Sequence, residues 1–510
     1  MLRMHLAAAL LATPGTAHAA WQKATSKHFI VYADDAPAKV QAFATRMELA
    51  DKAMRVLRSV GDPVISAESR VTVIVVPDVA TVNRLASTLG ARNVSGIYLP
   101  RASTSIALVP RRGEGDGPGK LSAQAVLLHE YAHHFMFSAL GGSVYPAWLV
   151  EGFAEFNATM TFEKDGSVSI GRPPLYDAYG IIEGSNMPIM TLLTAEPNSL
   201  PDNERAMFYG RGWLLTHYLT LDEGRRGNLA RYLAALNQGA EAKDAAKMLG
   251  DPGKLNRDLD RYTRTRLNIF KIPAAKLTIA PVTVDVLTPG AAAVMPAMIA
   301  SLRGVDGKTA ATVAAQARKL AAPFPTDAAA QNELAEAEHD AGNYADAQAA
   351  ADRALAADPK SIHAMMYAGL ARLAIASRAD NPDPAMFDAA RRWFRKANHA
   401  EPEYAWPLQM YYQSYVIAKQ RPTTNAEEGL LYARELAPYD AGLGMTAAHI
   451  QLQRGKNGEA ARLLKPIAYD PHGNSAATIA LKALTLIDQQ DAAAALAWLD
   501  NPNDRPAPAQ

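Results

Sequence analysis

The chain contains no cysteine. This absence excludes disulfide bonds, iron–sulfur clusters, cysteine nucleophiles and cysteine-ligated zinc, so any metal site must use histidine and carboxylate ligands. An excess of charge is also lacking, because 52 Lys and Arg face 51 Asp and Glu, for a formal net charge of +1. Without a basic surface, the sequence offers no electrostatic basis for binding nucleic acid or an anionic membrane.

Long apolar runs are scarce as well, and no segment after the N-terminus is long and apolar enough to span a bilayer. What the chain does have is the composition of a globular protein, with 49% hydrophobic and 20% charged residues. Its 510 residues predict roughly three units, each able to bury a core of its own.

Residues 1–19 have the features of a secretory signal peptide. A basic residue, Arg3, precedes the apolar run Leu6–Ala12, and a small-residue site, Ala17-His18-Ala19, would allow cleavage before Ala20. The alternative, a membrane anchor, would need about 20 apolar residues, whereas this run breaks at Pro14. We therefore expect an exported protein without a membrane span, in the periplasm if the source has two membranes.

Residues 20–120 alternate strand-like and helix-like patterns, which predicts a small α/β lobe. The expected strands are His28–Ala33, Val71–Pro77, Val94–Leu99 and Thr104–Val109, with a helix over Ala36–Val60. The stretch Arg111–Lys120 contains four glycines and predicts a loop, either a plain connector or a mobile cover.

Helical periodicity dominates the rest of the chain. We expect a helical lobe at 121–271, a linker rich in proline and β-branched residues at 272–305, paired helices at 306–500 and a flexible tail at 501–510. Within the paired helices Leu334–Pro359 resembles a tetratricopeptide repeat, and prolines recur at intervals of 33 to 43 residues from Pro325 to Pro471. The alternative is an unrelated alanine-rich bundle.

The chemistry lies in the helical lobe. His129-Glu130-Tyr131-Ala132-His133 is an H-E-x-x-H pattern, and residues four apart lie on one helical face, so both imidazoles can reach one metal ion. Glu130 lies beside that face, where it can take a proton from water. Downstream, Glu151 completes a His2Glu zinc set, and Glu155, one turn later, can accept the free ring N–H of a ligand histidine.

These residues resemble a gluzincin, a thermolysin-like zinc metallopeptidase, and Glu151-Gly152-Phe153-Ala154-Glu155 is similar to the E-G-x-A-E segment of peptidase-MA-like proteins. The resemblance implies an α+β metallopeptidase domain, made of an α/β lobe and a helical zinc lobe, followed by an all-α tetratricopeptide-like solenoid. It also implies a substrate strand along the edge of the α/β lobe, for which Thr104–Val109 is the expected edge. The chain departs from aminopeptidases of the membrane-alanyl type, because it lacks a Gly-x-Met-Glu-Asn motif.

The resemblance further implies a residue that stabilises the oxyanion, and Tyr209 is our choice. Tyr176, Tyr179 and His217 remain alternatives. His134 is expected off the metal face, and core positions are expected for Trp148, Phe153 and Trp213.

The sequence thus predicts an exported zinc metallopeptidase, a hydrolase with one Zn²⁺ per chain, whose repeats bind a protein partner or substrate. The alternative is a weak or inactive peptidase-like scaffold that acts through protein binding by its repeats. Because repeat units contact mainly their neighbours, we expect the peptidase half and the repeat half to be separable.

Overall fold

The computed structural model describes residues 20–87, 94–112, 121–140, 143–470 and 475–501. The expected signal peptide at 1–19, most of the expected glycine-rich loop and all but the first residue of the expected tail lie outside these residues. Within them, no helix combines the length and apolar character that a bilayer crossing requires.

A mixed six-stranded sheet forms the first lobe, in the order β4-β5-β3-β2-β1-β9. Its strands are β1 (Trp21–Thr25), β2 (Phe29–Asp34), β3 (Val71–Asp78), β4 (Ile97–Leu99), β5 (Ile106–Arg112) and β9 (Thr283–Val286). Strands β2, β3 and β5 run parallel, whereas β1, β4 and β9 pair antiparallel with their neighbours. Helix α1 (Pro37–Arg58) packs against β1, β2 and β9, and helix α2 (Val79–Ser87) packs against β3 and β5.

Two sequence predictions about this sheet are wrong. The expected edge strand, Thr104–Val109, corresponds to β5, which lies between β3 and β4, so the edge on this side of the sheet is β4 and the opposite edge is β9. The expected linker at 272–305 contains β9, which pairs with β1, and α11 (Pro289–Arg303), a helix capped by Thr288. The second error arises from pairing between segments far apart in the chain, β1 and β9, which local patterns do not encode. The first concerns neighbouring strands, whose order within the sheet is likewise not encoded by local patterns.

The second lobe is helical. It contains α3 (Ala123–Ala139), α4 (Ala147–Ala158), α5 (Ala178–Glu183), α6 (Ile189–Thr194), α7 (Asp202–Leu221), α8 (Asn228–Asn237), α9 (Ala242–Ala245) and α10 (Pro252–Tyr262). A small antiparallel sheet of β6 (Thr161–Phe162), β7 (Val168–Ile170) and β8 (Phe270–Ile272) borders it. One apolar core runs through both lobes, and Trp148, Phe153 and Trp213 lie in it, as expected.

The second half of the chain is an all-α solenoid of tetratricopeptide-like helix pairs. After α11 come α12 (Ala310–Ala321), α13 (Ala328–Asp340), α14 (Tyr344–Ala357), α15 (Ile362–Arg378), α16 (Pro384–Ala400), α17 (Ala405–Ile417), α18 (Thr424–Leu436), α19 (Ala441–Gln453), α20 (Asn457–Ala468), α21 (Ser475–Asp488) and α22 (Ala492–Asp500). Consecutive helices pack on each other, and their buried faces are rich in alanine, which allows close approach.

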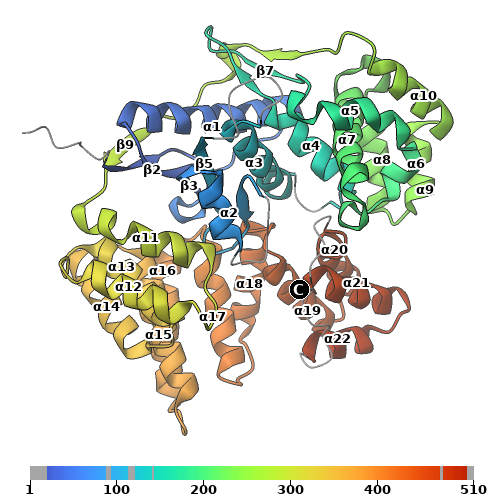
Figure 1. The fold of residues 1–510 in the computed structure, drawn as a ribbon. Coiled ribbons are helices and arrows are strands. Elements are labelled where there is room, and N and C mark those ends of the chain that lie inside the picture. Colours follow the sequence, from blue (N-terminus) through green and yellow to red (C-terminus); the bar gives the residue numbers. More distant parts are fainter. Residues whose placement is uncertain (1–19, 88–93, 113–120, 141–142, 471–474, 502–510) are drawn as a thin grey trace, which may run out of the picture.

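The two halves are not joined through a linker alone. In Figure 1 the solenoid, coloured yellow to red, passes beneath the sheet and reaches the region below α3 and α4. Ala102, in the loop before β5, is buried in an apolar cluster of repeat residues, and Met298, Ile299 and Leu302 of α11 pack on the sheet core. The two halves therefore share contacts beyond the connecting segment, although the repeats also have apolar clusters of their own. Whether the halves are separable stays a prediction.

Candidate metal centre

Helix α3 carries both histidines of the H-E-x-x-H pattern. Ser122 starts the helix, because its side chain accepts a hydrogen bond from the N–H of Ala125. One helical turn separates His129 from His133, and their Nε2 atoms lie 3.2 Å apart. Both rings therefore present a nitrogen to the same point in space.

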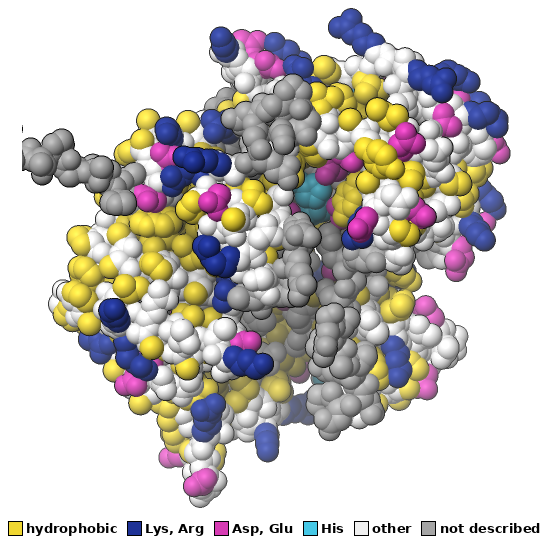
Figure 2. Space-filling model, viewed as in Figure 1, with side chains coloured by type: hydrophobic (Ala, Val, Ile, Leu, Met, Phe, Trp, Pro, Cys, Tyr) yellow, Lys and Arg dark blue, Asp and Glu magenta, His cyan; other side chains and the backbone are white. Residues whose placement is uncertain are grey.

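Helix α4 packs on α3 and brings a carboxylate to that point. Glu151 is 1% exposed, and its Oε2 lies 3.6 Å from Nε2 of His129 and 3.9 Å from Nε2 of His133. Ligand atoms at 2.0–2.1 Å from a tetrahedral zinc ion are about 3.4 Å apart. The spacing and chemistry of the three donors therefore fit one zinc ion. Figure 2 shows a histidine beside acidic side chains in a hollow of the surface.

A close helix crossing fixes the position of α4. A Cβ added to Gly152 would lie 2.4 Å from the carbonyl oxygen of Gly212 and 2.5 Å from Oγ1 of Thr216, both on α7. Only glycine allows this approach, so the residue directly after Glu151 sets how deeply α4 sits between α3 and α7.

The outer shell of the site is in place. Glu155 Oε1 lies 3.1 Å from Nδ1 of His129, which is the contact expected from the sequence. The other oxygen of Glu155 accepts a hydrogen bond of 2.7 Å from the Tyr176 hydroxyl. Tyr176, considered above for the oxyanion, thus holds Glu155, and the pair orients the imidazole of His129.

The electrostatics of the site favour a cation. Burial opposes protonation of His129, but hydrogen bonds to Glu151 and Glu155 and the charge of Glu130 raise its pKa well above 6.5. Burial, followed by the charge of Glu155, raises the pKa of Asp177 to about 7. Several carboxylates thus surround one point, which is the environment that a divalent cation stabilises.

Glu130 and His133 also line a cavity of about 450 Å³ beside the metal centre. Part of its wall comes from the β4 edge and the residues before it, including Gly96, Ile97 and Tyr98. The opposite wall comes from the solenoid. The general base proposed from the sequence therefore faces a space that can hold a ligand.

The three other residues considered for the oxyanion are in different environments. Tyr209 on α7 is half-buried, and burial, followed by the charges of Glu151 and Glu155, raises its pKa. Tyr179 is 55% exposed. His217 is fully buried, and its ring nitrogens contact the Tyr262 hydroxyl and two backbone carbonyl groups, so it supports the core rather than a ligand.

His134 lies off the metal face, as expected. Its Nδ1 is 2.5 Å from the Tyr98 hydroxyl, and its ring lies 5.0 Å from that of Tyr439 in the solenoid. Burial, followed by the positive charges of His28 and Arg55, lowers the pKa of His134 to about 3. The histidine is therefore neutral, and it joins α3 to β4 and to the repeats.

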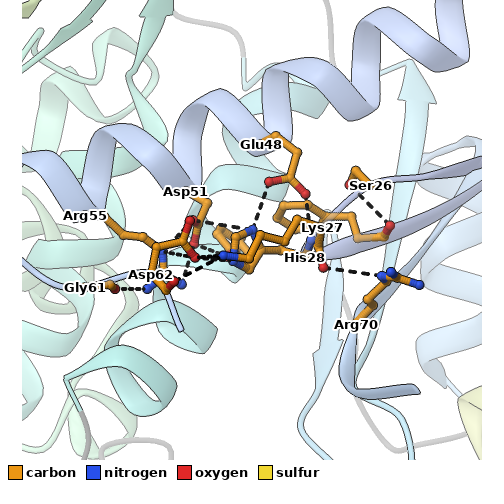
Figure 3. Close-up of polar contacts among 11 residues, drawn as sticks. Ser26, Lys27, His28, Glu48, Asp51, Arg55, Gly61, Asp62 and Arg70 are labelled. Atoms are coloured by element: carbon orange, nitrogen blue, oxygen red, sulfur yellow. Dashed lines mark hydrogen bonds and ion pairs between the residues drawn. The ribbon is translucent and has the colours of Figure 1, made fainter. Parts of the chain in front are cut away.

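The opposite face of α3 rests on a buried ion network (Figure 3). Asp51 on α1 accepts hydrogen bonds from Arg55. It also accepts one of 2.7 Å from the hydroxyl of Tyr131 on α3. His28 pairs with Glu48 at 2.8 Å. His28, Asp51 and Asp62 are spaced like metal ligands, but Arg55 already supplies the positive charge that Asp51 needs.

Sequence reasoning missed the solenoid residues that line the cavity, among them Arg434, Pro438 and Tyr439. They lie some 300 residues after the H-E-x-x-H motif, and no local pattern distinguishes them from other repeat residues. Only the path of the solenoid in space connects them with the site.

Similarity to known proteins is confined to weak structural matches. No protein-family model matches the chain. No curated protein matches it either. Among solved structures, a thermophilic TPR protein from Thermus thermophilus is 20% identical with a TM-score of 0.29, over 37% of this chain and 92% of that one. Yeast Tom70 is 13% identical with a TM-score of 0.26, over 61% of this chain and 70% of that one.

Proposed function

We propose that this protein is a zinc-dependent metallopeptidase of the gluzincin type that hydrolyses peptide bonds. One observation carries the proposal: Nε2 of His129, Nε2 of His133 and Oε2 of Glu151 lie 3.2–3.9 Å from one another, and His133 lines a cavity together with Glu130. The sequence resemblance to gluzincins supports the same assignment. His129, His133 and Glu151 would hold the zinc ion.

Zinc bound there supplies Lewis acidity, which activates water and polarises a carbonyl group. Glu130 is the general base, which accepts the proton of the attacking water and delivers it to the leaving amine. Glu155, held by Tyr176, keeps the ring of His129 in the orientation that frees Nε2 for the metal.

Tyr209 is the proposed oxyanion donor. Burial and the nearby carboxylates raise the pKa of its phenol, so the hydroxyl keeps its proton at neutral pH and can donate a hydrogen bond to a developing negative charge. The peptide substrate lies along β4, which is one of the two edge strands of the sheet and lines the cavity through Ile97 and Tyr98.

Two further assignments belong to this proposal. Residues 1–19 direct export across the inner membrane, cleavage follows Ala19, and the mature chain acts in the periplasm. The tetratricopeptide-like repeats bind a protein partner or substrate.

Metal content and turnover test the proposal directly. Purified mature protein should contain about one zinc per chain by elemental analysis. His133→Ala should lose the metal, whereas His399→Ala, which changes an exposed histidine on α16, should retain it. Glu130→Gln should keep zinc and fold but lose roughly 10²- to 10⁴-fold in turnover of a denatured protein substrate. Glu223→Gln, at a side chain that is 91% exposed, is the matched control.

Zinc-free wild-type protein, or zinc content unaffected by His133→Ala, would refute the metal site. Bound zinc with equal turnover by wild type and Glu130→Gln would refute the role of Glu130. Bound zinc without any turnover would favour the alternative function, a peptidase-like scaffold that works through its repeats.

A further inference from the structure

The solenoid forms one wall of the cavity beside the metal centre. Its contribution comes from the end of α18, the α18–α19 turn and the end of α20, through Arg434, Pro438, Tyr439, Asp440 and Ile467. Facing them are Glu130 and His133 of α3 and the β4 edge. A peptide bound in this cavity would therefore touch both halves of the chain.

Specific contacts hold this wall against the first lobe. Asp440 accepts a hydrogen bond of 2.8 Å from the N–H of Ala102, in the loop between β4 and β5. In the same loop, the carbonyl oxygen of Ser103 accepts a hydrogen bond from the Tyr404 hydroxyl. Tyr439 packs on His134, one residue after the metal ligand His133. The wall is thus fixed relative to the metal centre.

Arg434 is an unusual member of this wall. It is 8% exposed, and its Nε has no hydrogen-bond partner among the described residues. The described lining residues include three carboxylates, Glu130, Asp440 and Asp470, but no other Lys or Arg. The two oxygens of Asp440 accept backbone N–H groups of Ala102 and Leu443.

Burial of a guanidinium group is costly unless a partner compensates for the lost water. Burial accordingly lowers the pKa of Arg434, and the nearby charge of Asp440 offsets this effect only in part. A carboxylate is the partner whose geometry matches the N–H groups of arginine. A ligand that enters the cavity can supply one.

We propose that Arg434 pairs with a carboxylate group of the peptide bound in this cavity, so that the repeat half determines substrate preference. This inference rests on the proposed peptidase function. The carboxylate comes either from an Asp or Glu side chain or from the C-terminus of the peptide. Ile97, Pro438 and Ile467 provide apolar surface for the neighbouring part of the same peptide.

Peptide binding to full-length protein tests the inference without relying on turnover. Fluorescent peptides of identical length carry one Glu or one Gln, with either a free or an amidated C-terminus. Their affinities are measured by anisotropy with Glu130→Gln protein, which prevents hydrolysis. The neutral peptide cannot form the charge-assisted hydrogen bond with Arg434. The peptide with the carboxylate should therefore bind roughly 10- to 100-fold more tightly than its neutral counterpart.

Adding Arg434→Gln should abolish this ratio, and Arg434→Lys should restore part of it. Arg462→Gln is the matched control, because Arg462 is close enough to affect the pKa of Arg434 but is exposed and pairs with Glu459. If the affinity differs between the Glu and Gln peptides, the carboxylate comes from a side chain. If it differs between the free and amidated peptides, the carboxylate is the C-terminus.

Three results would overturn the inference. The affinity ratio between carboxylate-bearing and neutral peptides could be unchanged by Arg434→Gln, or the protein that retains Arg434 could bind both peptides equally. Alternatively, Arg434→Gln could weaken the binding of all peptides by the same factor. Turnover by wild-type protein is measured separately on the same peptides. Its absence would refute the proposed peptidase function while the binding ratio still decides the role of Arg434.

Discussion

Gly152→Ala is the most informative single change at the metal centre. The glycine lies on α4 between Glu151 and Glu155, at the closest approach of α4 to α7. An added methyl group would lie 2.4 Å from the carbonyl oxygen of Gly212 and 2.5 Å from Oγ1 of Thr216. The change therefore shifts the proposed metal ligand Glu151 without altering any of the three proposed ligands.

The magnitude follows from these distances. Nonbonded heavy atoms reach their best separation at about 3.5 Å, so α4 and α7 must move apart by about 1 Å. Overpacking of this kind typically lowers the free energy of unfolding by about 1–3 kcal/mol. Ligand distances in metal sites tolerate only about 0.2 Å, so zinc affinity should fall at least about tenfold as Glu151 moves with its helix.

Two measurements check this expectation. Urea unfolding of the metal-free protein reports the cost of overpacking, and competition with a chromogenic chelator reports zinc affinity. Gly458→Ala is the control, since nothing lies within 4 Å of the Cβ it would add in α20. It should leave zinc affinity unchanged. If Gly152→Ala matched wild type in both measurements, the argument that this crossing positions Glu151 would be wrong.

Two further predictions concern the supports of the site. His28→Gln should lower the free energy of unfolding more at pH 6 than at pH 9. Burial opposes protonation of His28, but Glu48 and Asp51 raise its pKa above 6.5. The stabilisation by the charged ring is therefore complete below pH 6.5 and is lost as the pH rises through the folded-state pKa. Urea unfolding at both pH values checks this, and a difference that grows with pH would contradict it. A chain ending at Lys271 lacks β9 and the repeat cluster that buries Ala102, so it should unfold at lower temperature and aggregate. A monomer with the melting temperature and zinc content of the full chain would show instead that the first half folds alone.

Much of the geometry of the candidate metal centre could be predicted from local sequence. A helix brings residues four apart to one face, so the spacing of His129 and His133 is enough to place their rings together. The same period places Glu151 and Glu155 on one face of a second helix. That these two helices, α3 and α4, pack together is a tertiary fact, and the close crossing of α4 with α7 at Gly152 helps to set the position of α4.

The sequence by itself determined the elements whose signals are local: the helical pairs of the second half, the strand character of β2 and β3, and the one-turn spacing of the H-E-x-x-H histidines. Only the tertiary structure decided that β4 is the edge of the sheet, that Tyr176 holds Glu155, and that Arg434 lines the cavity beside Glu130. The physical reason is that local periodicity indicates which face of a helix or strand is buried, but not which other segment packs against that face.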